Sequence, residues 1–337
     1  MNGGQSPYAS VLFYYDLYPQ EIEDLGKVKK ITTHQGVYAL KETTMTAHQA
    51  DEFIHALRKL TRLGYKQAVP ILPTKYGEYT IATGTHTYYL MPWMEPIEYT
   101  ARESQEEKLA SQLGVIHRLT VKTEPFLKEQ IDESFQQLLI RWERRRLELT
   151  RFADQAERKT YMSPFELTFL THAFMLDQMA LTAKDHLQKW YDLCLERGKY
   201  RTVLCHGRIQ RSHALFSPAN EPLLLNFERA SIDTPARDIA SFCRYSFPNA
   251  YWSEEEVLRW FMRYERHLPL LEEEKYLTFA YLNFPEPIAY AMEAYVNNQS
   301  QMSELEHVQR LEKRLTSMRK VQRLTQKLIV TSEQKQS

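Results

Sequence analysis

Three short apolar runs separated by polar loops constrain the fold of this chain more than any other feature. Residues 203–205 lead into His206-Gly207, residues 214–217 end at a turn that contains proline and asparagine, and residues 223–225 end at Asn226. The second and third runs, joined by such a turn, predict a β-hairpin. The loop 206–213 and the segment that starts at Asn226 would then lie together at the mouth of this hairpin.

The spacing of polar residues in these loops resembles the kinase-like fold of aminoglycoside and choline phosphotransferases. The pattern of that fold is His-Gly-Asp, four residues, Asn, and later Asp, an aromatic residue and Asp or Glu. His206, Gly207, Phe227 and Glu228 match it. The resemblance implies an α+β, bilobal, protein-kinase-like fold with a small β-rich N-lobe and a larger helical C-lobe.

The residues that phosphoryl transfer requires are replaced in this chain. By position, the catalytic Asp of the pattern becomes Arg208, the metal-binding Asn becomes His213 and the first metal-binding Asp becomes Asn226. Magnesium prefers carboxylate and phosphate oxygens, and a guanidinium remains protonated and cannot act as a base. No catalytic residue set is therefore intact, and the sequence predicts no metal site and no bound cofactor.

Other residues of the pattern are retained. The resemblance implies that His206 and Asp238 brace the catalytic loop, and Glu228 is the one carboxylate left at the metal turn 226–228. Arg208 together with Arg211 could hold a phosphate without metal. Alternatively, Arg208 could pair with Glu228 or Asp238, and we favour this pairing because an unpaired half-buried charge is costly.

A nucleotide cleft, if one is present, would involve the first hundred residues. Lys41 stands on an expected strand where kinases keep a phosphate-contacting lysine, with Glu52, or Asp51 beside it, as the expected partner on the next helix. Met91 and Trp93 lie where a nucleotide base would bind. The segment 31–36 holds a single glycine, so the expected phosphate cradle is weak.

Composition excludes several classes of protein. The 337 residues carry 43 basic and 43 acidic side chains, so no net charge attracts nucleic acid or an anionic membrane. The three cysteines form no metal-binding or disulfide pattern, which suits a reducing cytosol. We expect neither a secretory signal nor a membrane-spanning helix.

Hydrophobic periodicity predicts the order of the elements. The segment 11–18 fits either a helix or a strand, and 68–73 reads as extended. The expected strands are 27–31, 36–41, 79–82 and 86–91, and the expected helices are 48–63, one containing Leu109 and His117, 126–152, 164–196, 236–245, 253–266, 270–297 and 302–329.

The expected hinge is 91–96, and Thr100–Glu103 forms a predicted capping box. We divide the chain into an N-lobe (1–94), a C-lobe (95–300) and a C-terminal segment (301–337) whose basic helix has leucine, methionine and valine at spacings of three and four. That seam could support self-association, but packing on the C-lobe is the favoured interpretation. Residues 331–337 are expected to be disordered.

Several segments narrow the resemblance to the CotS family of bacterial spore coat proteins, with YsxE-like members as the nearest match. They include Gly36-Val37-Tyr38-Ala39-Leu40-Lys41, Tyr88-Tyr89-Leu90-Met91-Pro92-Trp93 and Leu113-Gly114-Val115-Ile116-His117-Arg118-Leu119. The resemblance covers about residues 10–300. It implies a protein made in the mother-cell cytoplasm and deposited on the spore coat, with other coat proteins as partners.

Three functions remain open from the sequence. The favoured one is a non-catalytic kinase-like protein, or pseudokinase, that acts in coat assembly or structure through protein–protein contacts. The alternatives are a divergent small-molecule phosphotransferase that uses Glu228 for its metal, with ATP as cofactor, and a metal-free nucleotide or anion sensor.

Overall fold

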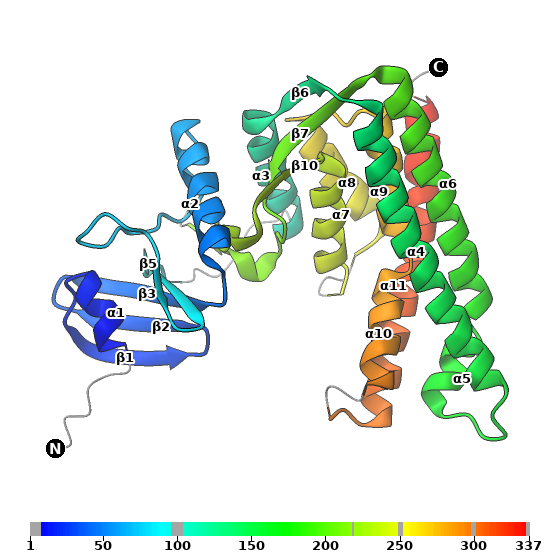
Figure 1. Ribbon diagram of the computed structural model, residues 1–337, viewed down its shortest axis with the longest axis horizontal. Helices are drawn as coiled ribbons and strands as arrows, with labels where there is room; N and C mark the ends of the chain where they lie inside the picture. Colours follow the sequence, from blue (N-terminus) through cyan, green and yellow to red (C-terminus); the bar gives the residue numbers. More distant parts are fainter. Residues whose placement is uncertain (1–7, 96–103, 218, 249–251, 298–300, 335–337) are drawn as a thin grey trace. The chain divides into compact units, whose positions relative to one another are not determined.

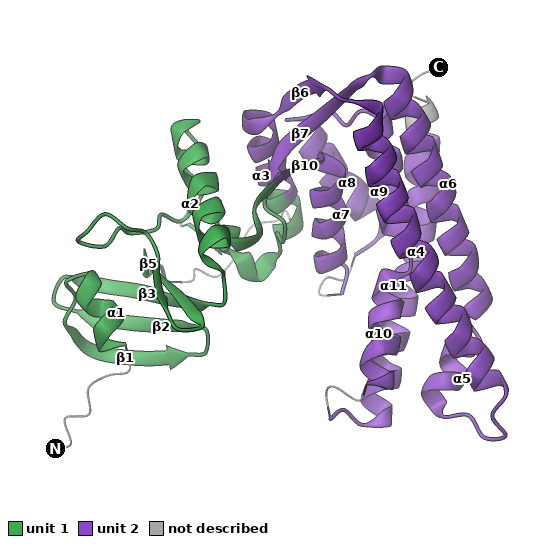
Figure 2. Ribbon diagram, viewed as in Figure 1, with its two compact units in different colours: residues 1–109, 206–231 green, residues 110–205, 232–337 purple. Residues whose placement is uncertain are grey.

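The computed structural model describes residues 8–95, 104–217, 219–248, 252–297 and 301–334 of the chain. Its contacts divide the chain into two compact units (Figure 2). Unit 1 contains residues 1–109 and 206–231, and unit 2 contains residues 110–205 and 232–337. This grouping differs from the lobes drawn from the sequence, because the segment 206–231 packs within unit 1.

Unit 1 is built on an antiparallel sheet with strand order β1-β2-β3-β5-β4 (Figure 1). The expected strands are confirmed as β2, β3, β4 and β5, whereas β1 was not expected. Seven residues with nearly all side chains exposed form this edge strand, so no apolar alternation signals it. The bounds are β1 (Pro19–Leu25), β2 (Val28–Thr33), β3 (Gly36–Thr43), β4 (Ile81–Thr83) and β5 (His86–Pro92).

Two helices accompany this sheet. The ambiguous segment 11–18 is helical in its first half, as α1 (Ala9–Tyr14), and buries Val11 and Leu12 beside Ile31 and Leu40 of the sheet. The predicted helix 48–63 is confirmed as α2 (Ala47–Arg62). Its first turn is closed by the reciprocal Thr46–Gln49 capping box, and its end is followed by Gly64 at a φ of +80°.

The predicted hairpin at 214–225 is also present in unit 1. It pairs β8 (Ala214–Phe216) with β9 (Pro222–Leu224), between the short 3-10 turns η1 (Arg211–His213) and η2 (Phe227–Arg229). The extended segment after α2 joins this hairpin, since the Val69 amide donates to the Leu224 carbonyl over 2.9 Å. The turn η2 packs against α2. These contacts join residues 206–231, called here the catalytic-loop segment, to the rest of unit 1, which contains the five-stranded sheet.

Unit 2 is mostly helical around a three-stranded sheet of order β10-β7-β6. The described helices and strands are α3 (Gln105–Thr120, which begins in unit 1), β6 (Lys122–Pro125), α4 (Lys128–Glu157), α5 (Pro164–Leu170), α6 (Ala173–Arg197), β7 (Lys199–Cys205), β10 (Ser231–Asp233, which also begins in unit 1), α7 (Pro235–Ser246), α8 (Glu254–Glu265), α9 (Glu272–Asn283), α10 (Glu286–Val296) and α11 (Glu304–Gln334). The capping box expected at Thr100–Glu103 lies outside the described residues, as does Pro96 of the expected hinge.

Two of the long helices expected from the sequence are interrupted. The pattern 164–196 is divided into α5 and α6 where Thr171 Oγ1 and the His172 ring each donate to a carbonyl one turn back. Such local side-chain bonds compete with continuation of the helix. The pattern 270–297 is divided into α9 and α10 at Phe284, which is extended before Pro285, as expected for a residue that precedes proline.

The apolar seam of α11 lies in the core of unit 2. Leu311, Leu315, Met318, Val321, Leu324 and Leu328 are buried, whereas Leu305 in the first turn is exposed. The helix packs against α5, α8, α9 and α10, so packing on the chain itself is confirmed. Several basic side chains of α11 are engaged internally as well: Arg323 bonds Glu254 over 2.8 Å and Lys327 bonds Glu255 over 2.6 Å. The buried part of the seam, from Leu311 to Leu328, is therefore not available for the self-association considered from the sequence. The helix also continues to Gln334, into the tail expected to be disordered.

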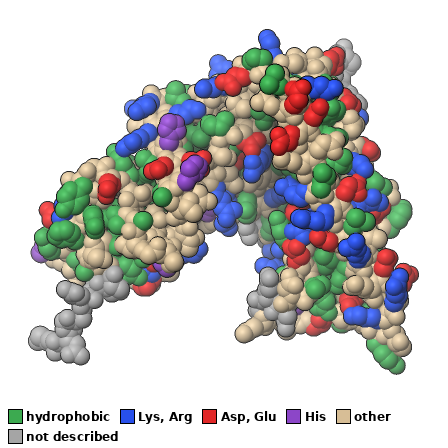
Figure 3. All heavy atoms as spheres, viewed as in Figure 1, with side chains coloured by type: hydrophobic (Ala, Val, Ile, Leu, Met, Phe, Trp, Pro, Cys, Tyr) green, Lys and Arg blue, Asp and Glu red, His purple; other side chains and the backbone are tan. Residues whose placement is uncertain are grey.

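Charged side chains of both signs are interspersed over the surface of unit 2 in the view of Figure 3. Among the residues that the structure describes, no helix combines the length and apolar character needed to cross a membrane.

Candidate functional site

The site is centred on the loop that follows β7. Gly207 has a φ of +78°, and a Cβ placed on it would lie 2.2 Å from the Arg229 carbonyl oxygen. Only glycine fits this close approach of the loop to η2. His206, which is fully buried, joins the same two segments: its Nε2 donates to the Leu225 carbonyl over 2.9 Å, and its ring packs 4.5 Å from that of Phe227. This is the geometry expected of a bracing histidine.

His213, at the position of a metal-binding Asn, has both ring nitrogens engaged. Its Nδ1 donates to the Arg208 carbonyl over 2.7 Å, and its Nε2 accepts from the Gln210 amide over 3.0 Å. Burial lowers the pKa of His213 to about 4, and the positive charges of Arg208 and Lys41 act in the same direction. At neutral pH the ring is therefore uncharged and has no lone pair left for a metal.

The retained carboxylate, Glu228, is the acid of this centre, whose other charged side chains are Lys41 and Arg208. Tyr89 of β5, itself fully buried, donates its hydroxyl to Glu228 Oε1 over 2.8 Å. Lys41 of β3 lies close enough to interact electrostatically with Glu228 and Arg208, and burial lowers its pKa, an effect that Glu228 opposes and Arg208 strengthens. Lys41 and Arg208 therefore outnumber the one carboxylate.

Asn226 completes the centre in an unusual backbone conformation. Its φ of 61° and ψ of 48° lie in the left-handed region, which asparagine tolerates better than most residues. Its side chain offers one neutral carbonyl oxygen in place of a carboxylate. Taken together, Arg208, His213 and Asn226 do not fit a magnesium ion, which needs carboxylate oxygens and a negative environment.

The structure does not join Lys41 to Glu52 as the sequence suggested. Glu52 is exposed on α2 and lies 3.5 Å from His48, and Asp51 is exposed as well. Among the described residues, Glu228 is the acid whose charge acts on Lys41. The expected partner was wrong because the acids beside Phe53 face away from the buried side of α2, a fact that sequence distance does not reveal.

Met91 and Trp93, the residues expected at a nucleotide base, are engaged within unit 1. Met91 is buried opposite Ala39, and the Trp93 amide donates to the Val37 carbonyl over 3.0 Å. The Trp93 indole donates to Glu95 over 2.8 Å. Lys30 of β2 lies 4.7 Å above the indole ring and 3.2 Å from Glu95. This Lys30–Trp93–Glu95 clamp holds the described part of the expected hinge.

The turn between the first two strands is not the one expected to cradle phosphate. Because β1 precedes β2, that turn is formed by Gly26 and Lys27, and the segment 31–36 connects β2 to β3. The Gly26 amide donates to Asp24 over 2.9 Å, and in the other turn the Gln35 amide donates to Thr33 over 3.1 Å. A phosphate cradle needs several amides aimed at the ligand, and both turns are short and bonded internally.

Asp238 belongs to a buried cluster in unit 2. It lies in the first turn of α7 and accepts from His117 Nε2 of α3 over 3.2 Å, while His117 Nδ1 bonds the Tyr264 hydroxyl of α8 over 2.7 Å. Cys205 is close enough that one ligand atom from each of His117, Cys205 and Asp238 lies within 4.8 Å of the others. Burial raises the pKa of the Cys205 thiol well above its usual value, so the cluster is a hydrogen-bonded core in which the thiol is protonated.

Sequence analysis missed Tyr89 and Tyr264 and placed His117 only on a helix face. Each acts through a partner more than a hundred residues away along the chain: 139 residues separate Tyr89 from Glu228, and 147 separate His117 from Tyr264. No local pattern signals such pairs.

Comparison with solved structures defines the class of the fold. An aminoglycoside phosphotransferase from Alicyclobacillus acidocaldarius superposes with a TM-score of 0.77 at 20% identity, covering 96% of this chain and 98% of that chain. A spectinomycin phosphotransferase in complex with ADP and spectinomycin gives 0.61 at 14% identity, with 91% and 96% covered. A microcompartment-associated aminopropanol kinase gives 0.56 at 10%, with 93% and 95% covered. The fold is that of the kinase-like phosphotransferases.

A family model narrows the class further. The model described as "Spore coat putative kinase YutH" matches residues 9–328. The chain therefore belongs to this family of kinase-like spore coat proteins. The resemblance to CotS proteins and the bilobal α+β fold are confirmed, with the matching model being that of YutH where the sequence segments suggested YsxE-like members.

Proposed function

We propose that this protein is a non-catalytic kinase-like component of the spore coat, made in the mother-cell cytoplasm and acting in coat assembly or structure through contacts with other coat proteins. One observation carries the proposal: the His213 ring, at a metal-binding position, is neutral and bonded on both sides to its own loop, at Arg208 and Gln210. The family match supports the association with the coat.

The charges of the centre support the same conclusion. Phosphoryl transfer depends on metal ions held by carboxylates and on a base that takes the acceptor proton. Here Arg208 stands at the position of the base, and a guanidinium does not accept a proton at ordinary pH. Lys41 and Arg208 together would repel a divalent cation that Glu228 alone would have to hold.

Thermal unfolding with ATP, in magnesium and in EDTA, tests the absence of a metal-nucleotide site. We expect the unfolding midpoint of the wild type to be the same in both. The variant Arg208→Asp/His213→Asn/Asn226→Asp restores the phosphotransferase pattern and should gain a magnesium-dependent shift, since a ligand at a hundred times its Kd adds about 2.7 kcal/mol. Arg62→Asp, an exposed charge change at the end of α2, is the control. Strong magnesium-dependent stabilisation of the wild type would contradict the proposal.

A cellular experiment distinguishes a structural role in the coat from a role that requires phosphoryl transfer. In sporulating cells, a fluorescent fusion carrying Lys41→Ala and Glu228→Gln should reach the coat as the wild type does. Loss of function in these spores with normal localisation would instead support the divergent phosphotransferase that uses Glu228. Transfer of labelled phosphate from ATP to sugars or amino alcohols, abolished by Glu228→Gln, would establish that alternative.

The excess of cations favours one further candidate, a metal-free anion or nucleotide sensor. Lys41 and Arg208 act on each other electrostatically, whereas Arg211 is half exposed with Glu106 3.8 Å away. Calorimetry with ATP in EDTA tests this candidate. Binding that Arg208→Ala weakens and Arg62→Ala, on the exposed side of α2, leaves unchanged would support it, and no binding by the wild type would exclude it.

A further inference from the structure

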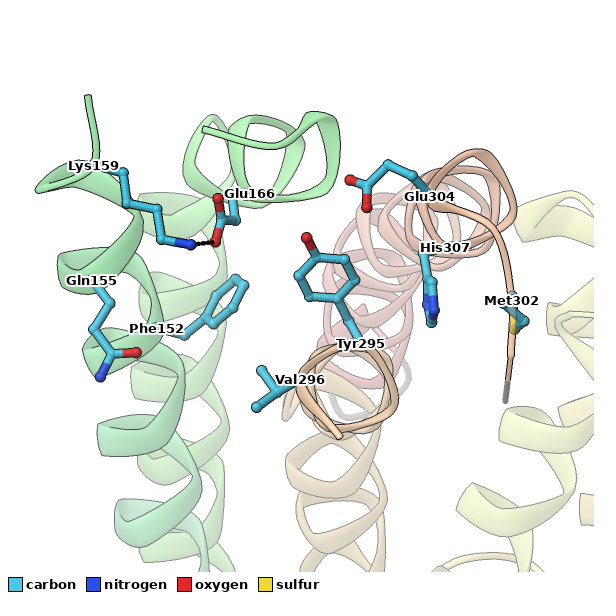
Figure 4. Close-up of a pocket in the computed structure, with 9 residues that line it drawn as sticks. All are labelled: Phe152, Gln155, Lys159, Glu166, Tyr295, Val296, Met302, Glu304 and His307. Atoms are coloured by element: carbon cyan, nitrogen blue, oxygen red, sulfur yellow. Dashed lines mark hydrogen bonds and ion pairs between the residues drawn. The ribbon is translucent and has the colours of Figure 1, made fainter. Parts of the chain in front are cut away.

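An open cavity of about 490 Å³ lies in unit 2, where α4, α5, α10 and α11 come together (Figure 4). None of its lining residues belongs to the phosphotransferase pattern. Its deeper wall contains Phe152, Glu166 and His307, each less than a tenth exposed. Gln155 and Lys159 lie at its exposed rim.

The polar groups of the cavity are mostly hydrogen-bond acceptors. Glu304 of α11 accepts from the Phe165 amide over 2.8 Å and interacts with the Tyr295 hydroxyl, which also bonds Ser163 over 2.8 Å. Glu166 accepts from the Ser163 amide over 2.9 Å. One lysine and two glutamates give the lining a formal charge of −1. Both carboxylates already accept backbone amides at the N-terminus of α5, so a further anion would be repelled.

The cavity already accepts one alkylammonium group. The side chain of Lys159, 51% exposed, extends from the end of α4 and bonds the buried carboxylate of Glu166. His307 is 4% exposed, and its ring contacts Phe165 and Tyr295 edge-on; within the described part of the chain the ring itself makes no hydrogen bond. The ring nitrogens of His307 line the cavity, so one of them can accept a hydrogen bond from a ligand there.

The described lining of this cavity does not bring together a set of metal ligands. Across the described residues, the group of His, Cys, Asp or Glu side chains that converges closely enough for a metal is His117, Cys205 and Asp238, which are elsewhere in unit 2. Glu166, Glu304 and His307 do not converge in this way. Aromatic faces from Phe152 and Tyr295 also line the cavity, and such faces favour an organic cation.

From these observations we infer that the cavity binds an alkylammonium or guanidinium group, with Glu304 as its counter-ion, His307 and Gln155 as acceptors and Phe152 and Tyr295 as apolar walls. Such a group is presented either by a lysine or arginine side chain of a partner protein or by a free polyamine. The inference stands independently of whether the protein binds ATP.

Calorimetry on the full chain at low salt tests the inference with acetyl-Gly-Lys-Gly-amide, with spermidine and with acetyl-Gly-Glu-Gly-amide. We expect the cationic probes to bind with a Kd on the order of 1 mM or below and the acidic peptide not to bind. Binding of the lysine peptide assigns the site to a protein side chain, whereas binding of spermidine alone assigns it to a free polyamine. No binding of either cation at 10-fold higher concentrations (on the order of 10 mM) overturns the inference.

Glu304→Gln keeps an acceptor for the Phe165 amide and removes the charge. We expect it to weaken binding of the cation about tenfold, while Glu312→Gln, an exposed acid on the same helix, leaves binding unchanged. Equal affinity of the wild type and Glu304→Gln would overturn the inference.

A rescue experiment gives a second readout that does not depend on the Glu304 variant. Lys159→Met leaves the buried Glu166 carboxylate without its ammonium, so the unfolding midpoint should fall. Adding n-butylammonium, which has the size of a lysine side chain, should raise the midpoint of Lys159→Met more than that of the wild type. The same response from both proteins would contradict binding at this carboxylate.

Discussion

The catalytic-loop segment and the buried cluster of His117, Asp238 and Tyr264 differ in what they retain of the phosphotransferase pattern. In the loop, the residues that would bind metal or act as a base are replaced, and the replacement His213 bonds the loop's own backbone. In the cluster, the bracing acid Asp238 is kept and paired with His117. The comparison teaches that the packing of the fold has been maintained where the charges needed for chemistry have not.

The largest expected effect is on the cluster. Asp238→Ala removes the buried partner of His117, and breaking a buried pair of this kind costs about 3–5 kcal/mol. Urea unfolding measures the loss. Asp154→Ala, on the exposed side of α4, should change stability by less than about 0.5 kcal/mol. If Asp238→Ala cost no more than this control, the cluster would not be a structural centre.

Gly207→Ala tests whether the loop is held by its packing. The added Cβ meets the Arg229 backbone at 2.2 Å in a left-handed conformation, so we expect a loss of about 2–4 kcal/mol. Gly198→Ala has a similar φ of +64° in open space and should cost only about 1–2 kcal/mol. Equal losses in urea unfolding would indicate that the loop relaxes away from Arg229.

The smallest effect is a pH dependence from His213. Its folded-state pKa of about 4 lies below the ordinary value of 6.5, so between these values the unfolded chain binds a proton that the folded chain excludes. Stability therefore falls as the pH decreases from 7 toward 4 and levels off below that. Allowing for solvent screening, the wild type should lose about 1 kcal/mol more than His213→Gln between pH 7 and pH 5.

The background for this measurement includes His186, whose pKa burial also lowers to about 4. It contributes equally to the wild type and to His213→Gln, so the difference between the two proteins isolates His213. His55→Gln, an exposed change on α2, is the control. Parallel pH profiles for the wild type and His213→Gln would show that the ring is not held neutral.

Local patterns predicted much of the fold. The capping box and the apolar face indicated α2, and turn residues between apolar runs indicated the hairpins β2–β3, β4–β5 and β8–β9. The edge strand β1 was missed because its side chains are nearly all exposed. The breaks at Thr171 and Phe284 were missed because apolar periodicity continues through them.

The candidate site was predictable only in part, because local sequence patterns do not show which distant residues meet. Positions in one short loop, such as Arg208 and His213, could be compared with a pattern along the chain. The pairing of Glu228 with Tyr89, and the absence of a pair between Lys41 and Glu52 among the described contacts, depend on which residues meet in space.

The amino-acid order alone determined that the usual base and metal ligands are missing, since the identity of a side chain sets its charge and its donor atoms. Tertiary structure decided how the remaining groups are used. The seam of α11 shows the difference most plainly: spacings of three and four residues suit a coiled coil or an internal helix equally. Burial of Leu311, Leu315 and Met318 against the chain's own helices selected the second, because an apolar stripe is stabilised by whichever surface removes it from water.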